Sequence, residues 1–227
     1  QIRDEVERAL LEDLGRAGDL SSQATIGPKN TVSALFVSRD EGVICGLSHA
    51  AVAFELMDSR LKFAPVVSDS DSVAENTVIA TVSGNARSVL SAERTALNFL
   101  CHLSGIATIT SKFVTAISHT TSKICCTRKT IPGLRASQKF AVRCGGGSNH
   151  RFGLDDAILI KDNHISVAGG VTKALEAARS FAGHLVKIEI EVDTIEQFEE
   201  AIRAGADCIL LDNFSVERLK EAVFISQ

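Results

Sequence analysis

The sequence predicts a two-part α/β protein: an N-terminal α+β domain over residues 1–105, then an incomplete α/β barrel with parallel strands over residues 106–227. The second part contains four short apolar runs separated by helical patterns, which is typical of parallel strands with right-handed crossovers. Charged residues follow each run at or near its downstream end, where α/β barrels build their active sites. Four strand–helix units are too few to close an eight-stranded barrel. The four runs are Ile124–Cys126, Ala157–Ile160, Ile188–Val192 and Cys208–Leu211.

The N-terminal part mixes helical and alternating patterns without this regular order. Apolar residues recur at helical spacing from Ile2 to Leu14 and stop at Gly15, which predicts a glycine-capped helix. The remaining predicted elements are a turn at Gly18–Ser22, strands at Thr31–Ser38, Gly42–Gly46 and Val78–Val82, and a helix at Leu47–Met57.

A long helical pattern joins the two parts. We expect one helix over Ala86–Leu103, a break at Ser104–Gly105, and a second helix over Ile106–Ile117. At the other end, Gln227 falls inside the helix expected after the last strand. The barrel is therefore expected to be incomplete at its C-terminus.

The composition is that of an ordinary globular protein, with 45% hydrophobic and 23% charged residues. A net charge of −4 argues against a general nucleic-acid binder, and no apolar stretch has membrane-spanning length. The six cysteines lack metal-site spacing, so we interpret them as reduced core residues of a cytoplasmic protein. Residues 128–161 contain seven lysines and arginines against two aspartates, a local net charge of +5. The sequence therefore predicts a cationic pocket in an acidic protein.

Two clusters in this cationic segment suit an anionic ligand. Arg128 and Lys129 end the first strand, and such a pair fits a carboxylate or a phosphate, although a solvated basic loop is the alternative. Gly145–Gly147 permits close backbone approach to a ligand and leads to His150 and Arg151. The glycines match no nucleotide-binding fingerprint, and a flexible hinge is the alternative.

Lys161 ends the second strand, and a lysine there needs an anion close by. A structural ion pair with Glu189 or Glu191 is the alternative to a catalytic role. Nearby His164 is as consistent with helix capping or packing as with catalysis.

The third strand alternates, placing Lys187, Glu189 and Glu191 on one face. We expect Lys187 and Glu189 to neutralise each other and Glu191, nearest the downstream end, to reach the active site. Asp212 ends the next strand. Carboxylates on two neighbouring strand ends suit Mg²⁺ held largely through water, as with diphosphate substrates.

Several motifs together make the chain resemble the quinolinate phosphoribosyltransferase family, also called nicotinate-nucleotide pyrophosphorylase (carboxylating). They occur in the family's order along essentially the whole chain. The motifs are Glu93–Asn98, Leu103–Ala107, Thr127–Thr130, Pro132–Arg135, Arg143–Gly147, Asn149–Arg151, Ile160–His164 and Leu211–Asn213.

This resemblance implies an N-terminal α+β sandwich-like domain, an incomplete α/β barrel, and a homodimer in which each N-terminal domain covers the partner's barrel mouth. It implies transfer of a phosphoribosyl group from phosphoribosyl pyrophosphate to quinolinate with decarboxylation, in NAD biosynthesis, with Mg²⁺. The products would be nicotinate mononucleotide, pyrophosphate and CO₂. Family members also carry glycine-rich phosphate-binding loops beyond the position of Gln227, and this chain contains none of them.

The resemblance also assigns roles to residues. Arg128, His150, Arg151 and Lys161 would bind the two carboxylates of quinolinate, and Arg94 would reach in from the other subunit. Lys129 would lie beside the substrate and pyrophosphate as a catalytic residue together with Lys161. Glu191 and Asp212 would act as catalytic carboxylates toward the ribose and would hold Mg²⁺ indirectly, through water and the diphosphate.

Three other functions remain possible at this stage. A related phosphoribosyltransferase of molybdenum-operon type would use the same fold for another anionic heterocycle. A barrel lyase would use Lys161 to form a Schiff base. A catalytically inactive binding subunit is the third.

Overall fold

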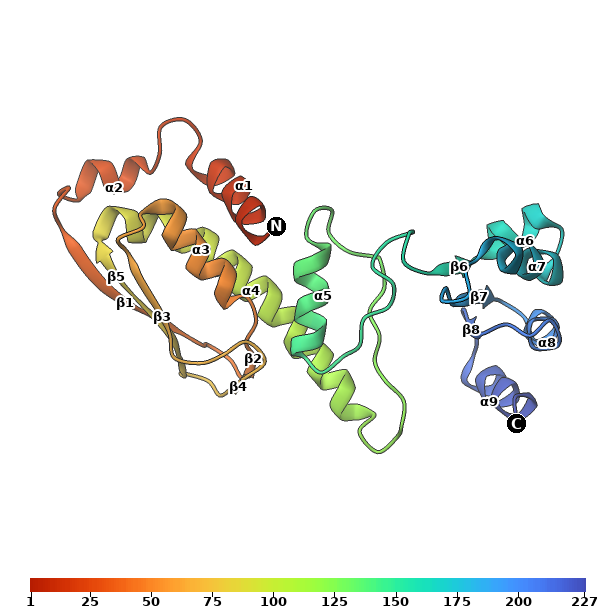
Figure 1. Ribbon diagram of the computed structural model, residues 1–227. Coiled ribbons are helices and arrows are strands. Elements are labelled where there is room, and N and C mark those ends of the chain that lie inside the picture. The colour runs from red at the N-terminus through yellow and green to blue at the C-terminus, as the bar shows by residue number, and fades with distance from the viewer. The chain divides into compact units, whose positions relative to one another are not determined.

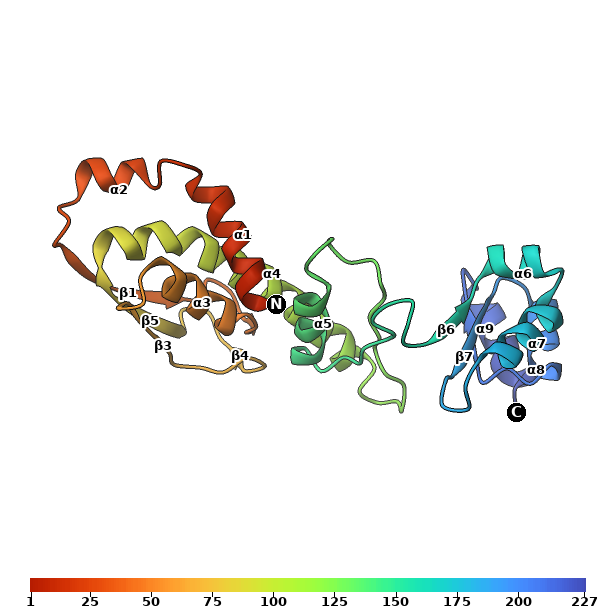
Figure 2. The same ribbon diagram turned by 45° about the horizontal axis from the view of Figure 1, so that its top comes forward.

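The computed structural model describes residues 1–227, which divide into two compact units, Gln1–His150 and Arg151–Gln227. Figures 1 and 2 show both units in two orientations. The first unit contains α1 (Ile2–Leu14), α2 (Leu20–Thr25), β1 (Thr31–Val37), β2 (Gly42–Val43), α3 (Leu47–Met57), β3 (Lys62–Pro65), β4 (Ser72–Val73), β5 (Val78–Asn85), α4 (Ala86–Ala116) and α5 (Arg135–Cys144).

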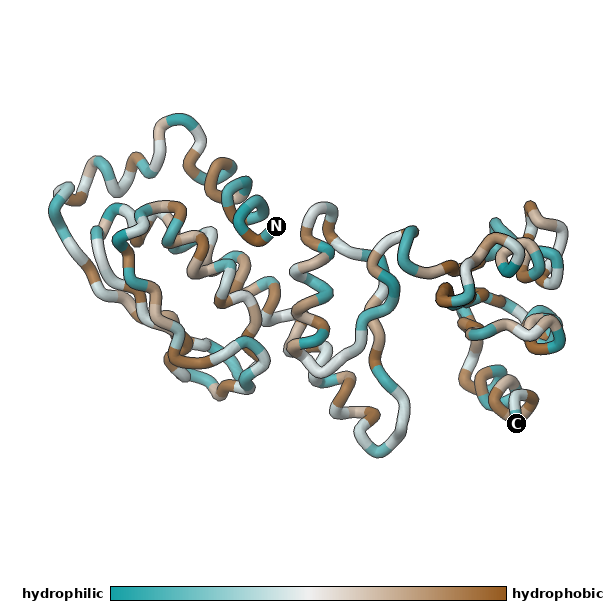
Figure 3. The backbone as a smooth tube through the Cα atoms, viewed as in Figure 1, coloured by the Kyte–Doolittle hydropathy of each residue, from teal (hydrophilic) through white to brown (hydrophobic).

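An antiparallel sheet with strand order β1-β5-β3 forms one layer of the first unit, and α3 and α4 pack on it (Figures 1 and 2). The core between these layers is apolar, and Phe54 and Phe63 stack within it, with Phe36 edge-on to both rings. Figure 3 shows apolar positions recurring along α3 and α4 between polar ones. Val89, Ala96 and Leu100 of α4 are buried in this core as their helical spacing predicted, whereas Leu90 is exposed.

Most predicted elements of this unit are present. The helices at 2–14 and 47–57 have the expected bounds, and Gly15 follows the first with a φ of 53°. The predicted turn at Gly18–Ser22 is partly wrong, because α2 begins at Leu20. The side chain of Asp19 accepts a hydrogen bond from the backbone N–H of Ser22 at 3.0 Å, which caps and stabilises this helix.

The predicted break at Ser104–Gly105 is wrong, since α4 runs from Ala86 to Ala116 without interruption. The Ser104 hydroxyl contacts the N–H and carbonyl of Cys45, at 2.9 and 3.1 Å, instead of competing with the helix backbone. Gly105 lies inside the helix, and no other group lies within 4 Å of the position that a Cβ would take. The predicted domain boundary after residue 105 falls inside this continuous helix, and the division into spatially compact units lies between residues 150 and 151.

A second cluster of buried side chains joins β2, α4 and α5, and includes Cys45, Leu103, Ala107, Ala141 and Cys144. It fixes α5 on the C-terminal half of α4 (Figure 1). The chain around residues 124–126 runs beside residue 148.

The predicted strand at Ile124–Cys126 is reduced to one isolated parallel bridge, between Cys125 and Ser148. Two backbone hydrogen bonds support it: Cys126 donates to Ser148 at 3.1 Å, and Ser148 donates to Ile124 at 2.8 Å. The contact is too short to count as a regular strand.

The second unit is a parallel sheet, β6-β7-β8, with helices packed on it. This confirms the parallel α/β part of the predicted fold class. Its elements are β6 (Ile158–Ile160), α6 (Asp162–Ala168), α7 (Val171–Phe181), β7 (Ile188–Val192), α8 (Ile195–Arg203), β8 (Cys208–Leu211) and α9 (Val216–Ile225).

The cysteines are less buried than expected. Only Cys45 and Cys144 are buried, whereas Cys101, Cys125 and Cys208 are exposed. None of the helices has the length and apolar character needed to cross a membrane.

Candidate functional site

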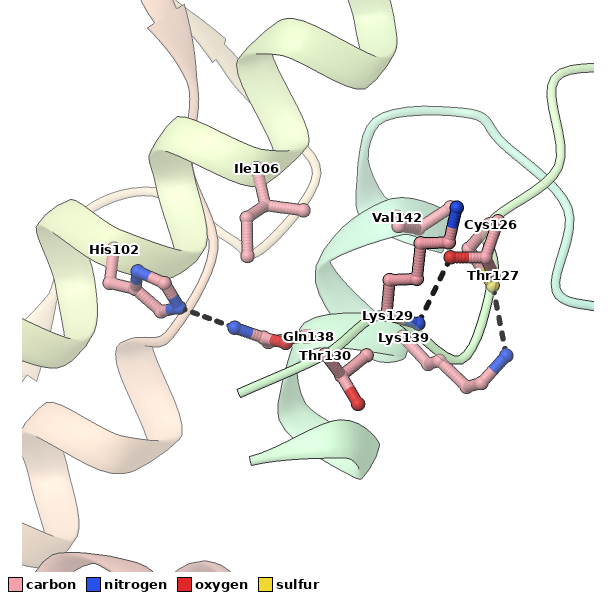
Figure 4. Close-up of a pocket in the computed structure, with 9 residues that line it drawn as sticks. All are labelled: His102, Ile106, Cys126, Thr127, Lys129, Thr130, Gln138, Lys139 and Val142. Atoms are coloured by element: carbon pink, nitrogen blue, oxygen red, sulfur yellow. Dashed lines mark hydrogen bonds between the residues drawn. The ribbon is translucent and has the colours of Figure 1, made fainter. Parts of the chain in front are cut away.

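The first unit contains a pocket of about 320 Å³ between α4, α5 and the segment that follows residue 125 (Figure 4). Two lysines line it, and no aspartate or glutamate does. The pocket is therefore suited to an anion. Its lining residues are His102, Ile106, Cys126, Thr127, Lys129, Thr130, Gln138, Lys139 and Val142.

The segment with the predicted cations is held by its own threonines. Thr127 Oγ1 accepts a hydrogen bond from the backbone N–H of Lys129 at 3.0 Å, visible in Figure 4. The N–H of Thr130 donates to the carbonyl of Arg128 at 2.9 Å, and Thr130 Oγ1 accepts from Arg135 Nε at 3.1 Å. Arg128 Nε is buried without a hydrogen-bond partner. These hydrogen bonds order the turn, in which Thr127 and Lys129 are exposed and Arg128 is partly buried.

Gln138, which is buried on α5, links this turn to α4. Its Oε1 accepts from the backbone N–H of Ile131 at 3.0 Å, so its Nε2 is the donor toward His102 Nε2 at 2.8 Å (Figure 4). His102 Nε2 must then be unprotonated. This chain of bonds fixes the orientation of two residues that line the pocket.

The three consecutive glycines have a structural role in packing. A Cβ on Gly145 would overlap the Ala107 carbonyl of α4, and one on Gly147 would lie 2.8 Å from Thr110 Cγ2. Gly146 has a φ of 84°. The backbone at Gly145–Gly147 thus lies close to α4, whereas we expected it to lie close to a ligand. The sequence pattern alone did not indicate this packing.

The other predicted site residues of this unit lie apart. Arg94 is exposed on α4 and is not among the residues that line the pocket. His150 ends the unit, and its carbonyl oxygen accepts a hydrogen bond from Lys139 Nζ at 2.9 Å. Lys139 therefore connects His150 with the pocket.

In the second unit, Lys161 and Glu191 form an ion pair of 2.8 Å across β6 and β7. The Lys161 side chain is 45% exposed and that of Glu191 is 13% exposed. The predicted alternative of a structural ion pair is present, so Lys161 is a partly neutralised cation here. His164 Nδ1 accepts from the Lys161 backbone N–H at 2.8 Å, which is the capping role we considered.

The strand register places Asp212 near this pair. Glu191 is opposite Leu210 in the parallel ladder, and partners in register share a face. Asp212 follows two residues after Leu210, and its N–H donates to the carbonyl of Val192 at 3.0 Å. Lys161, Glu191 and Asp212 therefore lie on one face at the carboxyl ends of the strands, opposite the apolar core.

Arg151 begins the second unit. Its Nη1 donates to the carbonyl of Ala157 at 3.2 Å, while its Nε is buried without a partner. Beside it, Asp156 accepts from the N–H groups of Phe152 and Gly153 at 2.6 and 2.9 Å. These hydrogen bonds hold the pKa of Asp156 below its ordinary value. The turn therefore keeps a carboxylate near Arg151.

Lys187 has a partner that the sequence analysis did not consider. Its Nζ lies 3.4 Å from Asp207 Oδ1, and Asp207 also accepts from the N–H of Ile188 at 3.1 Å. The Ile188 hydrogen bond is the main reason that the pKa of Asp207 is lowered. This pair sits at the opposite end of β7 from Glu191, so it lies away from the candidate site.

Lys139, His102 and Gln138 were not among the site residues predicted from the sequence. The signal was weak: Ser137, Gln138 and Lys139 are all buried on α5, at positions where a sequence pattern would lead one to expect exposed polar residues. A lysine only 3% exposed is unusual enough to indicate a specific role.

The donors for Mg²⁺ are limited. No group of three or more histidines, cysteines, aspartates and glutamates is arranged to hold a metal ion. Glu191 is engaged by Lys161, and Asp212 Oδ2 accepts from Asn213 Nδ2 at 2.9 Å. Two carboxylates on one face suit only a Mg²⁺ that keeps most of its other ligands from water and phosphate.

The fold and these charged positions define a class: an α/β enzyme scaffold that carries cations and carboxylates at the carboxyl ends of parallel strands. Two family models match the chain. The N-terminal domain of quinolinate phosphoribosyl transferase matches residues 19–104, and the C-terminal domain matches residues 106–227. The chain belongs to the quinolinate phosphoribosyl transferase family.

Individual relatives agree with this family. A probable nicotinate-nucleotide pyrophosphorylase [carboxylating] of Bacillus subtilis is 45% identical over 94% of this chain and 73% of its own length. The nicotinate-nucleotide pyrophosphorylase [carboxylating] of Mycobacterium leprae is 44% identical over 97% of this chain and 78% of its own. The solved nicotinate-nucleotide pyrophosphorylase from Francisella tularensis has a TM-score of 0.93 at 42% identity, covering 99% of this chain and 79% of that one. The chain thus spans about three quarters of the length of these relatives.

Proposed function

We propose that this protein transfers the phosphoribosyl group of phosphoribosyl pyrophosphate to quinolinate and releases CO₂, forming nicotinate mononucleotide and pyrophosphate. The observation that carries the proposal is the match of both family domains, which together cover nearly the whole chain. Two features of the geometry support it. The pocket of the first unit is lined by lysines and by no aspartate or glutamate, and the strands of the second unit end in carboxylates.

The chemistry needs both kinds of charge. The ring nitrogen of quinolinate forms a bond to C1′ of the ribose as pyrophosphate leaves, and positive charge develops on the sugar. Carboxylates such as Glu191 and Asp212 near the sugar would stabilise that charge. Mg²⁺ held through the diphosphate would stabilise the leaving group. The C2 carboxylate then leaves as CO₂ because the ring nitrogen is already positive, and the ring carbon takes up a proton.

We assign the diacid to the cations. Arg128 and Arg151 each have a buried Nε that donates to no protein acceptor, and a carboxylate would compensate such a guanidinium group. His150 and Lys161 complete the proposed set, and Lys129 lines the pocket of the first unit. The Schiff-base alternative is disfavoured, because Lys161 Nζ is held by Glu191 at 2.8 Å and is not free to approach a carbonyl carbon.

The decisive experiment follows CO₂ from quinolinate labelled in its 2-carboxylate, using the full-length protein. We expect release only when phosphoribosyl pyrophosphate and Mg²⁺ are both present, with one nicotinate mononucleotide formed for each CO₂. No release would indicate another acceptor or an inactive binding subunit. Trapping of a carbonyl substrate on Lys161 by borohydride would instead support a lyase.

We further propose a homodimer in which Arg94 acts in the partner's site; its exposure on α4 leaves it free to do so. Complementation tests this directly. Arg94→Ala and Lys161→Met should each be inactive alone, yet an equal mixture that exchanges subunits should recover about a quarter of the activity, because half of the dimers are mixed and each has one intact site. No recovery of activity, with subunit exchange confirmed by mass spectrometry, would place Arg94 in its own subunit's site.

A cytoplasmic location is also proposed, and cell fractionation would test it.

A further inference from the structure

Lys139 is a buried cation to which the proposed chemistry assigns no contact with a substrate. Its side chain is on α5 and is only 3% exposed. Its ammonium donates to Cys126 Sγ at 3.0 Å and to the carbonyl oxygen of His150 at 2.9 Å (Figure 4 shows the first bond). Burying an ammonium is unfavourable unless strong hydrogen bonds compensate, so these two bonds hold Lys139 in one place.

These two acceptors belong to segments far apart in sequence that both carry proposed ligands for quinolinate. Cys126 precedes Arg128 by two residues, and His150 is itself a proposed ligand. The two segments are joined by backbone hydrogen bonds only as far as Cys126 and Ser148. Lys139 forms hydrogen bonds with both segments at the point where these backbone hydrogen bonds end.

Cys126 is well suited to receive the ammonium. Its Sγ contacts Asn149 Oδ1 at 3.4 Å, so the thiol hydrogen points toward Asn149 and a sulfur lone pair remains for Lys139. Asn149 adjoins His150. The thiol, the amide and the ammonium thus form a second connection between the segments, made by side chains.

We propose that Lys139 is a positioning residue: its ammonium fixes the segment that carries Arg128 and Lys129 against His150, so that the proposed acceptor ligands of this unit keep one geometry before quinolinate arrives. This inference rests on the proposed function. Preorganised ligands bind without the entropic cost of ordering. A displacement of about 1 Å at such a site lowers activity by about 100-fold.

The test compares four variants of the full-length protein, measuring kcat, the KM of each substrate, and quinolinate binding by calorimetry. Lys139→Met should raise the KM and Kd of quinolinate by about 10- to 100-fold, with a smaller change for phosphoribosyl pyrophosphate. Cys126→Ala should shift quinolinate in the same direction. Cys126→Ser should stay near the wild type, because a hydroxyl can accept from Lys139 and donate to Asn149. Lys112→Met, an exposed lysine of α4, is the matched control and should change nothing.

The double variant Lys139→Met/Cys126→Ala shows whether the two residues act together. If Lys139 acts through Cys126, the double variant should bind quinolinate about as well as Lys139→Met alone. Fully multiplied effects, or an unchanged quinolinate KM in Lys139→Met, would overturn the inference. If Lys139→Met does not fold, the comparison of Cys126→Ala with Cys126→Ser decides, and equal KM values overturn it. An inactive wild type would count against the proposed function instead.

Discussion

Two glycine-to-alanine substitutions in the first unit should have opposite effects on stability. A Cβ on Gly145 would overlap the Ala107 carbonyl and lie 2.7 Å from Thr110 Cβ. That distance is about 1 Å shorter than a favourable carbon–carbon contact, and both obstacles belong to the helix α4, which cannot move locally. Gly145→Ala must therefore push α5 away from α4, and we expect a loss of about 3 kcal/mol in the free energy of unfolding.

Gly105→Ala is the matched control. Gly105 is exposed within α4, with nothing within 4 Å of the position of a Cβ. Alanine has the higher helix propensity and restricts the unfolded chain, so stability should rise by about 0.5–1 kcal/mol. Urea unfolding should be followed by circular dichroism, because the chain has no tryptophan or tyrosine for fluorescence. Two variants that are equally stable would refute the packing argument.

Three further predictions concern the site and the core. Arg151→Ala or Lys161→Ala should abolish CO₂ release while changing the melting temperature little. The Lys161–Glu191 ion pair is partly solvated, and such pairs contribute at most about 1 kcal/mol to stability. Near-normal turnover in either variant would contradict the site assignment. Burial lowers the pKa of His49 from its ordinary value of 6.5, although Glu5 and Asp69 act in the opposite direction. Below pH 6.5 this histidine takes up a proton in the unfolded chain but not in the folded protein. The free energy of unfolding should therefore be constant above pH 6.5 and decrease below it. His49→Gln should remove part of this decrease in urea titrations from pH 8 to pH 5, and an identical profile would show that another group is responsible. Gln138→Leu should destabilise by about 1–3 kcal/mol in thermal unfolding, since the Ile131 N–H and His102 lose their partner; a wild-type melting curve would mean that water replaces it.

The sequence predicted the parallel part of the fold well, because short apolar runs alternate there with segments of helical periodicity. The apolar runs at 157–160, 188–192 and 208–211 are bounded by helical patterns, and all three form adjacent parallel strands. The same alternation placed Glu191 on the polar face. By contrast, the run at 124–126 makes only two backbone hydrogen bonds, both with Ser148, and forms an isolated bridge instead of a strand.

Other features depended on contacts that a pattern does not contain. The break expected at Ser104–Gly105 did not form because the serine hydroxyl binds Cys45, far away in sequence. Gly145–Gly147 was interpreted as a ligand loop, whereas its spacing fits the surface of α4. Lys139 looked like one more surface cation in a basic segment, and only tertiary contacts show that it is buried. Long-range packing decided each of these cases.

The uninterrupted α4 helix has a consequence for how the first unit opens. Its N-terminal half is packed under the antiparallel sheet, and its C-terminal half supports α5. A helix of 31 residues is about 46 Å long, so it carries both clusters on a single hydrogen-bonded rod. The sheet and α5 should therefore open together as a single cooperative element, even though their apolar clusters are separate. In hydrogen exchange with solvent, the most protected amide hydrogens of the sheet and of α5 should then exchange at one common rate.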